Sequence, residues 1–351
     1  MRKAWVIVCC IVGTLLIGIV LVRAILFPGY KELETSGKYA VLQSSAILID
    51  STRTDPFEQD GSFREVPVHF YYPETAAGST ERFPLVAFSH GAFGYYQSNT
   101  STYRELASNG YVVVALDHPH HAFFTKDSDG KTVIVDRQFL RTAMRLNDGM
   151  DAPERYGLYT EWMALRTADM NFVLDELKTT ANADILPVLE RTDFSKIGLM
   201  GHSMGGAAAV ELGRERNDIS AVIDLDGTML SEYTGIENGA LAIREDPYTV
   251  PVLEFNNWES YNDLKEYLAQ GGSYPNDVLI RGASAGFTTT IRDTKHMDFT
   301  DLPLLSPFLG NMLGSGYRDT AEAMAIVNSL VLEFYDCYLK GQGVFTVQDI
   351  Y

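Results

Sequence analysis

Short apolar runs alternate with amphipathic segments along most of the chain. Residues 66–72 alternate apolar and polar positions, whereas residues 84–89 and 111–117 are continuous apolar runs, as in buried parallel strands. The same criteria predict further strands over 195–201, 220–226, 250–256 and 287–291, and helices over 98–109, 158–177, 203–213, 259–269 and 320–340. This order predicts an α/β fold, with a mostly parallel central sheet and helices on both of its faces.

The N-terminus carries a different pattern. Arg2 and Lys3 precede an uncharged run from Ala4 to Val22, which is long enough to cross most of a hydrocarbon core as a helix. We predict a membrane anchor over residues 1–25, an N-terminal transmembrane helix with the rest of the chain on the extracytoplasmic side. A cleaved signal peptide and a buried core helix are the alternatives.

The rest of the chain is predicted to form one folded domain. Residues 26–60 are polar and contain Pro28, Gly29 and Pro56, so we interpret them as a linker. The domain then covers residues 61–351. Within it, residues 118–156 have weak periodicity and many charges, which indicates an insertion placed over the functional site.

Residues 201–205 read Gly-His-Ser-Met-Gly and match the pattern G-x-S-x-G. A predicted strand precedes this pattern and a small-residue helix follows it, which is the setting of a nucleophile elbow. In such a turn the glycines leave room for a strained serine, and the helix N-terminus offers free N–H groups to an oxyanion. We therefore predict Ser203 as the nucleophile of an α/β-hydrolase fold and Met204 N–H as one oxyanion donor.

A serine nucleophile needs a histidine base, and in this fold the histidine follows the acid along the chain. His296 is the only histidine after Ser203, and it begins a loop behind a predicted strand. His296 is thus the predicted base.

The acid that orients this histidine has several candidates. Asp226 ends the strand at 220–226 and is the preferred one. Asp224 lies two residues deeper on the same face and is interpreted as a structural acid. Glu259 and Asp263 follow the next strand, where many α/β-hydrolases keep their acid.

A second oxyanion donor is expected where the strand at 84–89 ends. Residues 89–94 read Ser-His-Gly-Ala-Phe-Gly, a glycine-bearing turn. We predict that Ala92 N–H completes an oxyanion hole with Met204 N–H.

Several of these motifs together resemble those of the platelet-activating-factor acetylhydrolases and their bacterial relatives, in the dienelactone-hydrolase-like branch of the α/β-hydrolases. The similar stretches are Arg53–Pro56, Val68–Pro73, Phe88–Gly91, Gly201–Gly206, Leu225–Met229 and His296–Asp301. The resemblance implies Asp226 as the acid in preference to Glu259. It also implies calcium-independent hydrolysis of short or oxidised acyl esters.

Other features limit the choice of function. A net charge of −18 argues against nucleic acid as a partner. His118, His120 and His121 could suggest a metal, but no nearby ligands complete a tetrahedral set, so they are expected to line the mouth of the site or to cap the strand end. We expect neither a metal nor another cofactor.

The combined prediction is a serine carboxylic-ester hydrolase that acts on short-acyl or lipid esters through an acyl-enzyme. A cutinase-like polyester hydrolase ranks second, because Asn256, Asn257 and Trp258 offer no acid where cutinases place theirs. A thioesterase and a non-catalytic, membrane-anchored binding protein are the remaining alternatives.

Overall fold

The computed structural model describes residues 18, 20–30, 32–146 and 149–351. Most of the predicted membrane anchor, residues 1–25, lies outside them. Within the described part of the chain, no helix is both long enough and apolar enough to cross a membrane.

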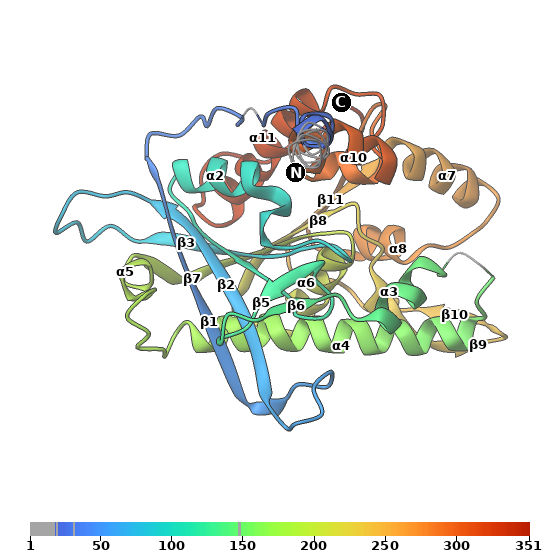
Figure 1. The fold of residues 1–351 in the computed structure, drawn as a ribbon. Coiled ribbons are helices and arrows are strands. Elements are labelled where there is room, and N and C mark those ends of the chain that lie inside the picture. The colour runs from blue at the N-terminus through green and yellow to red at the C-terminus, as the bar shows by residue number, and fades with distance from the viewer. Residues whose placement is uncertain (1–17, 19, 31, 147–148) are drawn as a thin grey trace, which may run out of the picture.

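Eight strands form the central sheet, in the order β1-β2-β4-β3-β7-β8-β11-β12 (Figure 1). β2 pairs antiparallel with β1 and β4, and the other neighbours pair in parallel. The strands of this sheet are β1 (Val41–Thr54), β2 (Phe63–Pro73), β3 (Phe83–Ser89), β4 (Val112–Leu116), β7 (Thr192–His202), β8 (Ile219–Leu225), β11 (Val252–Asn257) and β12 (Gly286–Ile291). Two small hairpins consist of β5 (Phe124–Lys126) with β6 (Thr132–Ile134) and β9 (Tyr233–Glu237) with β10 (Ala240–Ile243).

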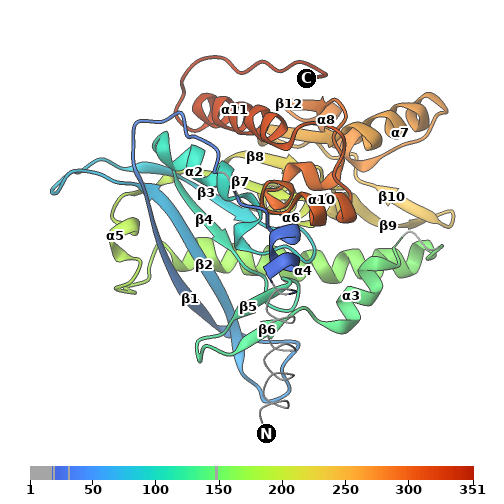
Figure 2. The same cartoon turned by 45° about the horizontal axis from the view of Figure 1, so that its top comes forward.

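Helices cover both faces of the sheet, as Figures 1 and 2 show. One apolar core joins α4, α6 and α8 to one face, and a second core joins α2 and α11 to the other. The helices are α2 (Thr100–Ser108), α3 (Arg137–Met144), α4 (Ala152–Glu176), α5 (Leu186–Leu189), α6 (Met204–Glu215), α7 (Trp258–Ala269), α8 (Pro275–Gly282), α9 (Leu302–Leu305), α10 (Pro307–Leu313) and α11 (Thr320–Tyr338), with short 3-10 turns η1 (Tyr96–Asn99), η2 (Leu230–Glu232) and η3 (His296–Phe299). The predicted mostly parallel α/β sheet is confirmed.

The prediction that residues 26–60 are a linker is wrong, because this segment contains β1. β1 pairs with β2 along residues 41–54 and forms the edge of the sheet. Only Leu48 and Asp50 are fully buried in it, and most of its other polar residues are exposed. An edge strand buried on one side needs few apolar residues, so its sequence resembles a polar linker.

The segment predicted as an insertion, residues 118–156, contains β5, β6, α3 and the first turn of α4. Asp151 caps α4 by accepting a hydrogen bond from Glu154 N–H, so this helix begins before the predicted residue 158. The segment contacts the turn after β3, where Phe93 N–H donates to His121 O at 3.1 Å and Phe123 N–H donates to Gly94 O at 3.0 Å.

A buried arginine links the antiparallel edge of the sheet to α4. Arg64 of β2 is fully buried, and its guanidinium lies 2.7 Å from Asp169 Oδ2 of α4 and 2.9 Å from Asp55 Oδ2. Removal of this cation would leave Asp169 buried with less compensation, which is costly in a low-dielectric interior.

We therefore expect Arg64→Ala to lower the free energy of unfolding by about 3–5 kcal/mol in equilibrium urea unfolding. The control is Arg281→Ala, because Arg281 pairs with Asp277 on the surface and its side chain is 69% exposed. This control should cost less than about 1 kcal/mol. Equal losses in the two variants would contradict the role assigned to Arg64.

Candidate active site

Ser203 occupies a sharp turn between β7 and α6. Its φ is 55° and its ψ is −125°, a strained region for a residue with a side chain. Its N–H donates to Leu225 O of the neighbouring β8 at 2.8 Å, which ties the turn to the sheet. The residue is half-buried, so its hydroxyl can meet solvent or a ligand.

The glycines around Ser203 are required by close backbone contacts. A Cβ at Gly201 would lie 2.2 Å from Gly205 C and O, and a Cβ at Gly205 would lie 2.0 Å from Ser89 O. A Cβ at Gly206 would lie 1.8 Å from Asp224 Oδ1. Glycine at positions 201, 205 and 206 therefore allows the strand, the turn and the helix to pack closely, because there is no space for a side chain at these positions.

Asp226 and His296 are brought together from segments that are distant in the sequence. Asp226 follows β8 with a φ of 58°, and His296 begins η3 after β12. His296 Nδ1 lies 2.6 Å from Asp226 Oδ2. The contact leaves the other ring nitrogen, Nε2, free to face a nucleophile.

The environment of His296 suits a base. Burial lowers its pKa, but the hydrogen bond and negative charge of Asp226 outweigh this effect and raise the pKa above the usual value. Its side chain is 44% exposed, whereas that of Asp226 is 4% exposed. The carboxylate is therefore shielded from water, and the imidazole remains accessible.

Asn257 fixes the Asp226 carboxylate, a role that its residue type alone does not predict. Its N–H donates to Asp226 Oδ1 at 2.7 Å, and its side-chain Nδ2 donates to Oδ2 at 2.8 Å. These donors leave Oδ2 oriented toward His296. The signal in the sequence is an asparagine at the end of a buried strand.

The other candidate acids lie elsewhere. Asp224 is fully buried and accepts a hydrogen bond from Gly227 N–H at 3.0 Å. Burial and nearby carboxylates hold the pKa of Asp224 well above its usual value. Glu259 is 61% exposed and pairs with Lys295 at 2.9 Å. The residue that contacts His296 Nδ1 is Asp226.

Residues 296–301 are anchored to α2 by the later members of the motif. Ser101 N–H donates to Asp301 Oδ2 at 2.7 Å, and Asn99 Nδ2 donates to Phe299 O at 2.6 Å. The His-Met-Asp-Phe-Thr-Asp sequence thus holds the histidine loop against η1 and the start of α2, which follow β3.

Ala92 and Met204 lie in two turns that are in contact. A Cβ at Gly91 would be 3.2 Å from Ser203 Cβ, so the turn after β3 packs directly on the elbow. Among the described residues, neither Ala92 N–H nor Met204 N–H donates to a protein acceptor. Both amides are therefore available for a ligand oxygen.

His202 supports the base. It is buried, and its Nε2 lies 3.1 Å from the backbone oxygen of His296, with the two rings 4.6 Å apart. Burial and the neighbouring His296 hold the pKa of His202 well below its usual value, so it remains neutral.

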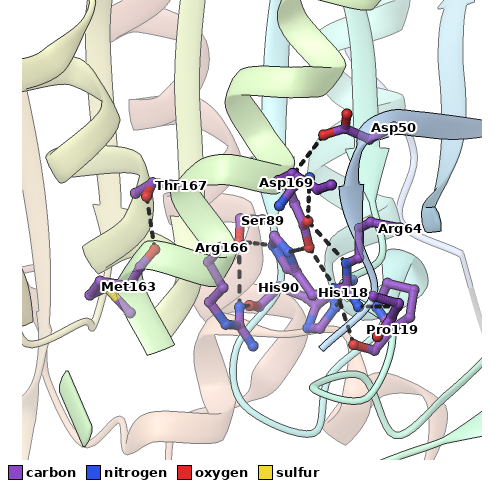
Figure 3. Close-up of polar contacts among 12 residues, drawn as sticks. Asp50, Arg64, Ser89, His90, His118, Pro119, Met163, Arg166, Thr167 and Asp169 are labelled. Atoms are coloured by element: carbon purple, nitrogen blue, oxygen red, sulfur yellow. Dashed lines mark hydrogen bonds and ion pairs between the residues drawn. The ribbon is translucent and has the colours of Figure 1, made fainter. Parts of the chain in front are cut away.

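A second Ser–His–Asp series lies inside the protein (Figure 3). Ser89 Oγ is 2.8 Å from His118 Nε2, and His118 Nδ1 is 3.0 Å from Asp169 Oδ2. All three residues are fully buried. Because Ser89 is inaccessible to a substrate, this series is structural and braces the end of β3.

The expectation that His118, His120 and His121 line the mouth of the site is wrong for the two buried members of this cluster. His118 and His121 are buried, and His120 stacks on Phe57. Within the described residues, no group of His, Cys, Asp and Glu side chains is arranged to hold a metal ion.

The sheet, the elbow and the Asp226–His296 pair define a protein of the α/β-hydrolase class. Residues 66–140 and 168–347 match the family described as platelet-activating factor acetylhydrolase, isoform II. The chain belongs to this family.

Individual relatives are distant. The platelet-activating factor acetylhydrolases of Cavia porcellus and Gallus gallus are 22% and 25% identical, each over 74% of this chain, and the matches cover 58% and 63% of their own length. Cutinase 2 of Thermobifida cellulosilytica is 24% identical over 73% of this chain and 85% of its own. The solved ferulic acid esterase of Streptomyces cinnamoneus has a TM-score of 0.66 at 22% identity, and the match covers 90% of this chain and 95% of that one. The chain thus matches less than two thirds of the length of these acetylhydrolases.

The Asp226–His296 contact predicts a measurable ionisation. The pKa of His296, measured by NMR, should exceed 6.5 in the wild type and fall below it in Asp226→Asn, where burial acts without an opposing charge. Glu259→Gln is the control and should leave it unchanged. An unchanged pKa in Asp226→Asn would rule out this pairing in solution.

Proposed function

We propose that this protein is a serine carboxylic-ester hydrolase that works through an acyl-enzyme. The observation that carries the proposal is the 2.6 Å contact between His296 Nδ1 and Asp226 Oδ2 beside a serine at a strained elbow. Membership of a family described as acetylhydrolases supports it, as do the esterase and cutinase names of the relatives.

In the proposed mechanism His296 Nε2 takes the proton of Ser203 Oγ as this oxygen attacks the ester carbonyl. The carbonyl oxygen becomes negative and accepts hydrogen bonds from Ala92 N–H and Met204 N–H. His296 then gives the proton to the departing alcohol, and an acyl-serine remains. A water molecule, deprotonated by His296, attacks the acyl-serine and releases the carboxylic acid and the free serine. Asp226 stabilises the imidazolium throughout.

Ser203 Oγ has no hydrogen-bonding partner among the described residues. In enzymes of this type the bond between nucleophile and base often forms only when the substrate is bound. The mechanism therefore requires Ser203 Oγ and His296 Nε2 to come within hydrogen-bonding distance when the substrate binds.

Short-acyl and lipid esters are the proposed substrates. The names of the acetylhydrolase relatives and of a probable 1-alkyl-2-acetylglycerophosphocholine esterase from Arthroderma benhamiae, 26% identical over 191 residues, support this choice. Polyesters are the second candidate, because the Thermobifida cellulosilytica cutinase matches over 85% of its length. The two substrate classes can be distinguished by comparing rates of hydrolysis. The test substrates are p-nitrophenyl esters from acetate to palmitate, a phospholipid with a short sn-2 chain and a polyester film.

The catalytic roles predict the effects of single substitutions. Ser203→Ala and His296→Ala should each lower kcat for p-nitrophenyl acetate about 10⁴-fold, with little change in KM, because both groups act in the transition state. Asp226→Asn should lower kcat by a similar order, since the histidine then loses its orienting charge.

Glu259→Gln is the matched control for Asp226→Asn, because Glu259 is a nearby acid that pairs with Lys295 on the surface. It should retain kcat within about twofold. Activity of His296→Ala within tenfold of the wild type would exclude the assigned base. If a fluorophosphonate labels Ser203 in no condition, the non-catalytic binding alternative replaces the enzyme.

We further propose that the uncharged run from Ala4 to Val22 anchors the protein to a membrane, with the hydrolase domain on the extracytoplasmic side. The full-length protein should then remain with membranes through high salt and alkaline carbonate. Release by salt alone would indicate a peripheral attachment. A mature N-terminus beyond residue 22 would indicate a cleaved signal peptide.

A further inference from the structure

Arg166 is a fully buried cation that lacks a direct carboxylate partner. Among the described residues it forms no ion pair with an Asp or Glu side chain, and only the longer-range charge of Asp169 supports its ionised form, although burial of an unpaired charge is costly. Its donors are directed instead at the turn after β3. Nη1 donates to His90 O (Figure 3), and Nη2 donates to Gly91 O at 3.3 Å.

Gly91 O receives more hydrogen bonds than a carbonyl in a turn requires. His90 Nδ1–H donates to it at 2.7 Å and Gly94 N–H donates to it at 3.1 Å, in addition to Arg166 Nη2. The tautomer of His90 is fixed, because its Nε2 accepts a hydrogen bond from His118 N–H at 3.2 Å. Three donors therefore hold one carbonyl oxygen in place.

This carbonyl belongs to the same peptide group as Ala92 N–H, the expected oxyanion donor. The described chain has no cis peptide bonds, so the C=O and N–H of this group point in opposite directions. Donors that bind Gly91 O on one side fix the direction of Ala92 N–H on the other. They also polarise the peptide, which strengthens its N–H as a donor.

Asp169 is the carboxylate whose charge supports the ionised form of Arg166, and it compensates that cation only in part. Burial holds the pKa of His90 well below its usual value and lowers that of His118 to about 4, so both rings are neutral. Asp169 has four donors of its own, from Arg53, Arg64 and His118. Arg166 is thus the cation nearest to the Gly91 carbonyl.

We propose that Arg166 is a positioning residue that orients and polarises the Gly91–Ala92 peptide for the oxyanion hole. The inference rests on the proposed function. In this inference Arg166 does not contact the substrate. It acts by orienting Ala92 N–H, which donates to the oxygen that becomes negative in the transition state.

The test compares Arg166→Gln and the milder Arg166→Lys with the wild type in the full-length protein. The probes are an alkyl trifluoromethyl ketone, which forms an anionic adduct with the serine, and the corresponding secondary alcohol, which cannot form one. For Arg166→Gln, kcat/KM for p-nitrophenyl acetate and affinity for the ketone should both fall about 10²-fold, the loss typical of one oxyanion donor. Arg166→Lys should show a smaller loss of both. Affinity for the alcohol should stay within about twofold in each variant, because binding without an oxyanion does not use Ala92 N–H.

Arg53→Gln is the matched control, since Arg53 also contacts Asp169 but does not touch the β3 turn. It should keep kcat/KM within about threefold. The inference is overturned if the folded Arg166 variants bind the ketone as tightly as the wild type, or if ketone and alcohol lose affinity equally. A wild-type protein that binds the ketone no more tightly than the alcohol would overturn the proposed function, and the inference with it.

Discussion

The site depends on the contact between the turns that follow β3, β7 and β8. The backbone atoms of these turns are in direct contact. A Cβ at Gly205 would lie 2.0 Å from Ser89 O, and a Cβ at Gly227 would lie 2.3 Å from Ser203 O. Since such contacts cannot relax by rotation of a side chain, they fix the elbow relative to the oxyanion turn and the acid. The positive φ values of Ser203 and Asp226 are tolerated because the packed turns hold them there.

Two sets of polar side chains lie near these turns, one accessible to solvent and one buried, and they differ in function. On the exposed side, His296 remains accessible and its pKa is raised by Asp226, which suits a proton carrier. On the buried side, Ser89, His118 and Asp169 are joined by hydrogen bonds from serine to histidine to aspartate, but they have no access to solvent. A complete series of hydrogen bonds is therefore not enough to identify a catalytic serine, because the serine must also be accessible to a substrate.

The sequence was sufficient for the elements with strong periodicity. The buried strands such as β3 and β4 were predicted within a residue or two because continuous valine-rich runs are typical of strands buried on both faces. β1 was missed because an edge strand needs little apolar surface. Ser203 and His296 were identifiable from a local motif and from chain order. Arg166 and Asn257 were not, because the carbonyls and carboxylate that they bind come from segments that only folding brings together.

The neutral buried histidines also make the stability of the fold depend on pH. Burial holds the pKa values of His90, His118, His121 and His202 below the usual 6.5, so the folded protein leaves them unprotonated while an unfolded chain would protonate them. Groups of this kind stabilise the fold above pH 6.5, and the stability is lost as the pH falls. Four such groups correspond to at most about 5 kcal/mol per pH unit below 6.5. His296, whose pKa is raised, acts in the opposite direction and only above pH 6.5, where the stability that it contributes is lost as the pH rises. Proton uptake on unfolding, measured by calorimetry in buffers of different ionisation enthalpy, would register this coupling. An acidifying environment would therefore act on the scaffold of the oxyanion turn as well as on the base.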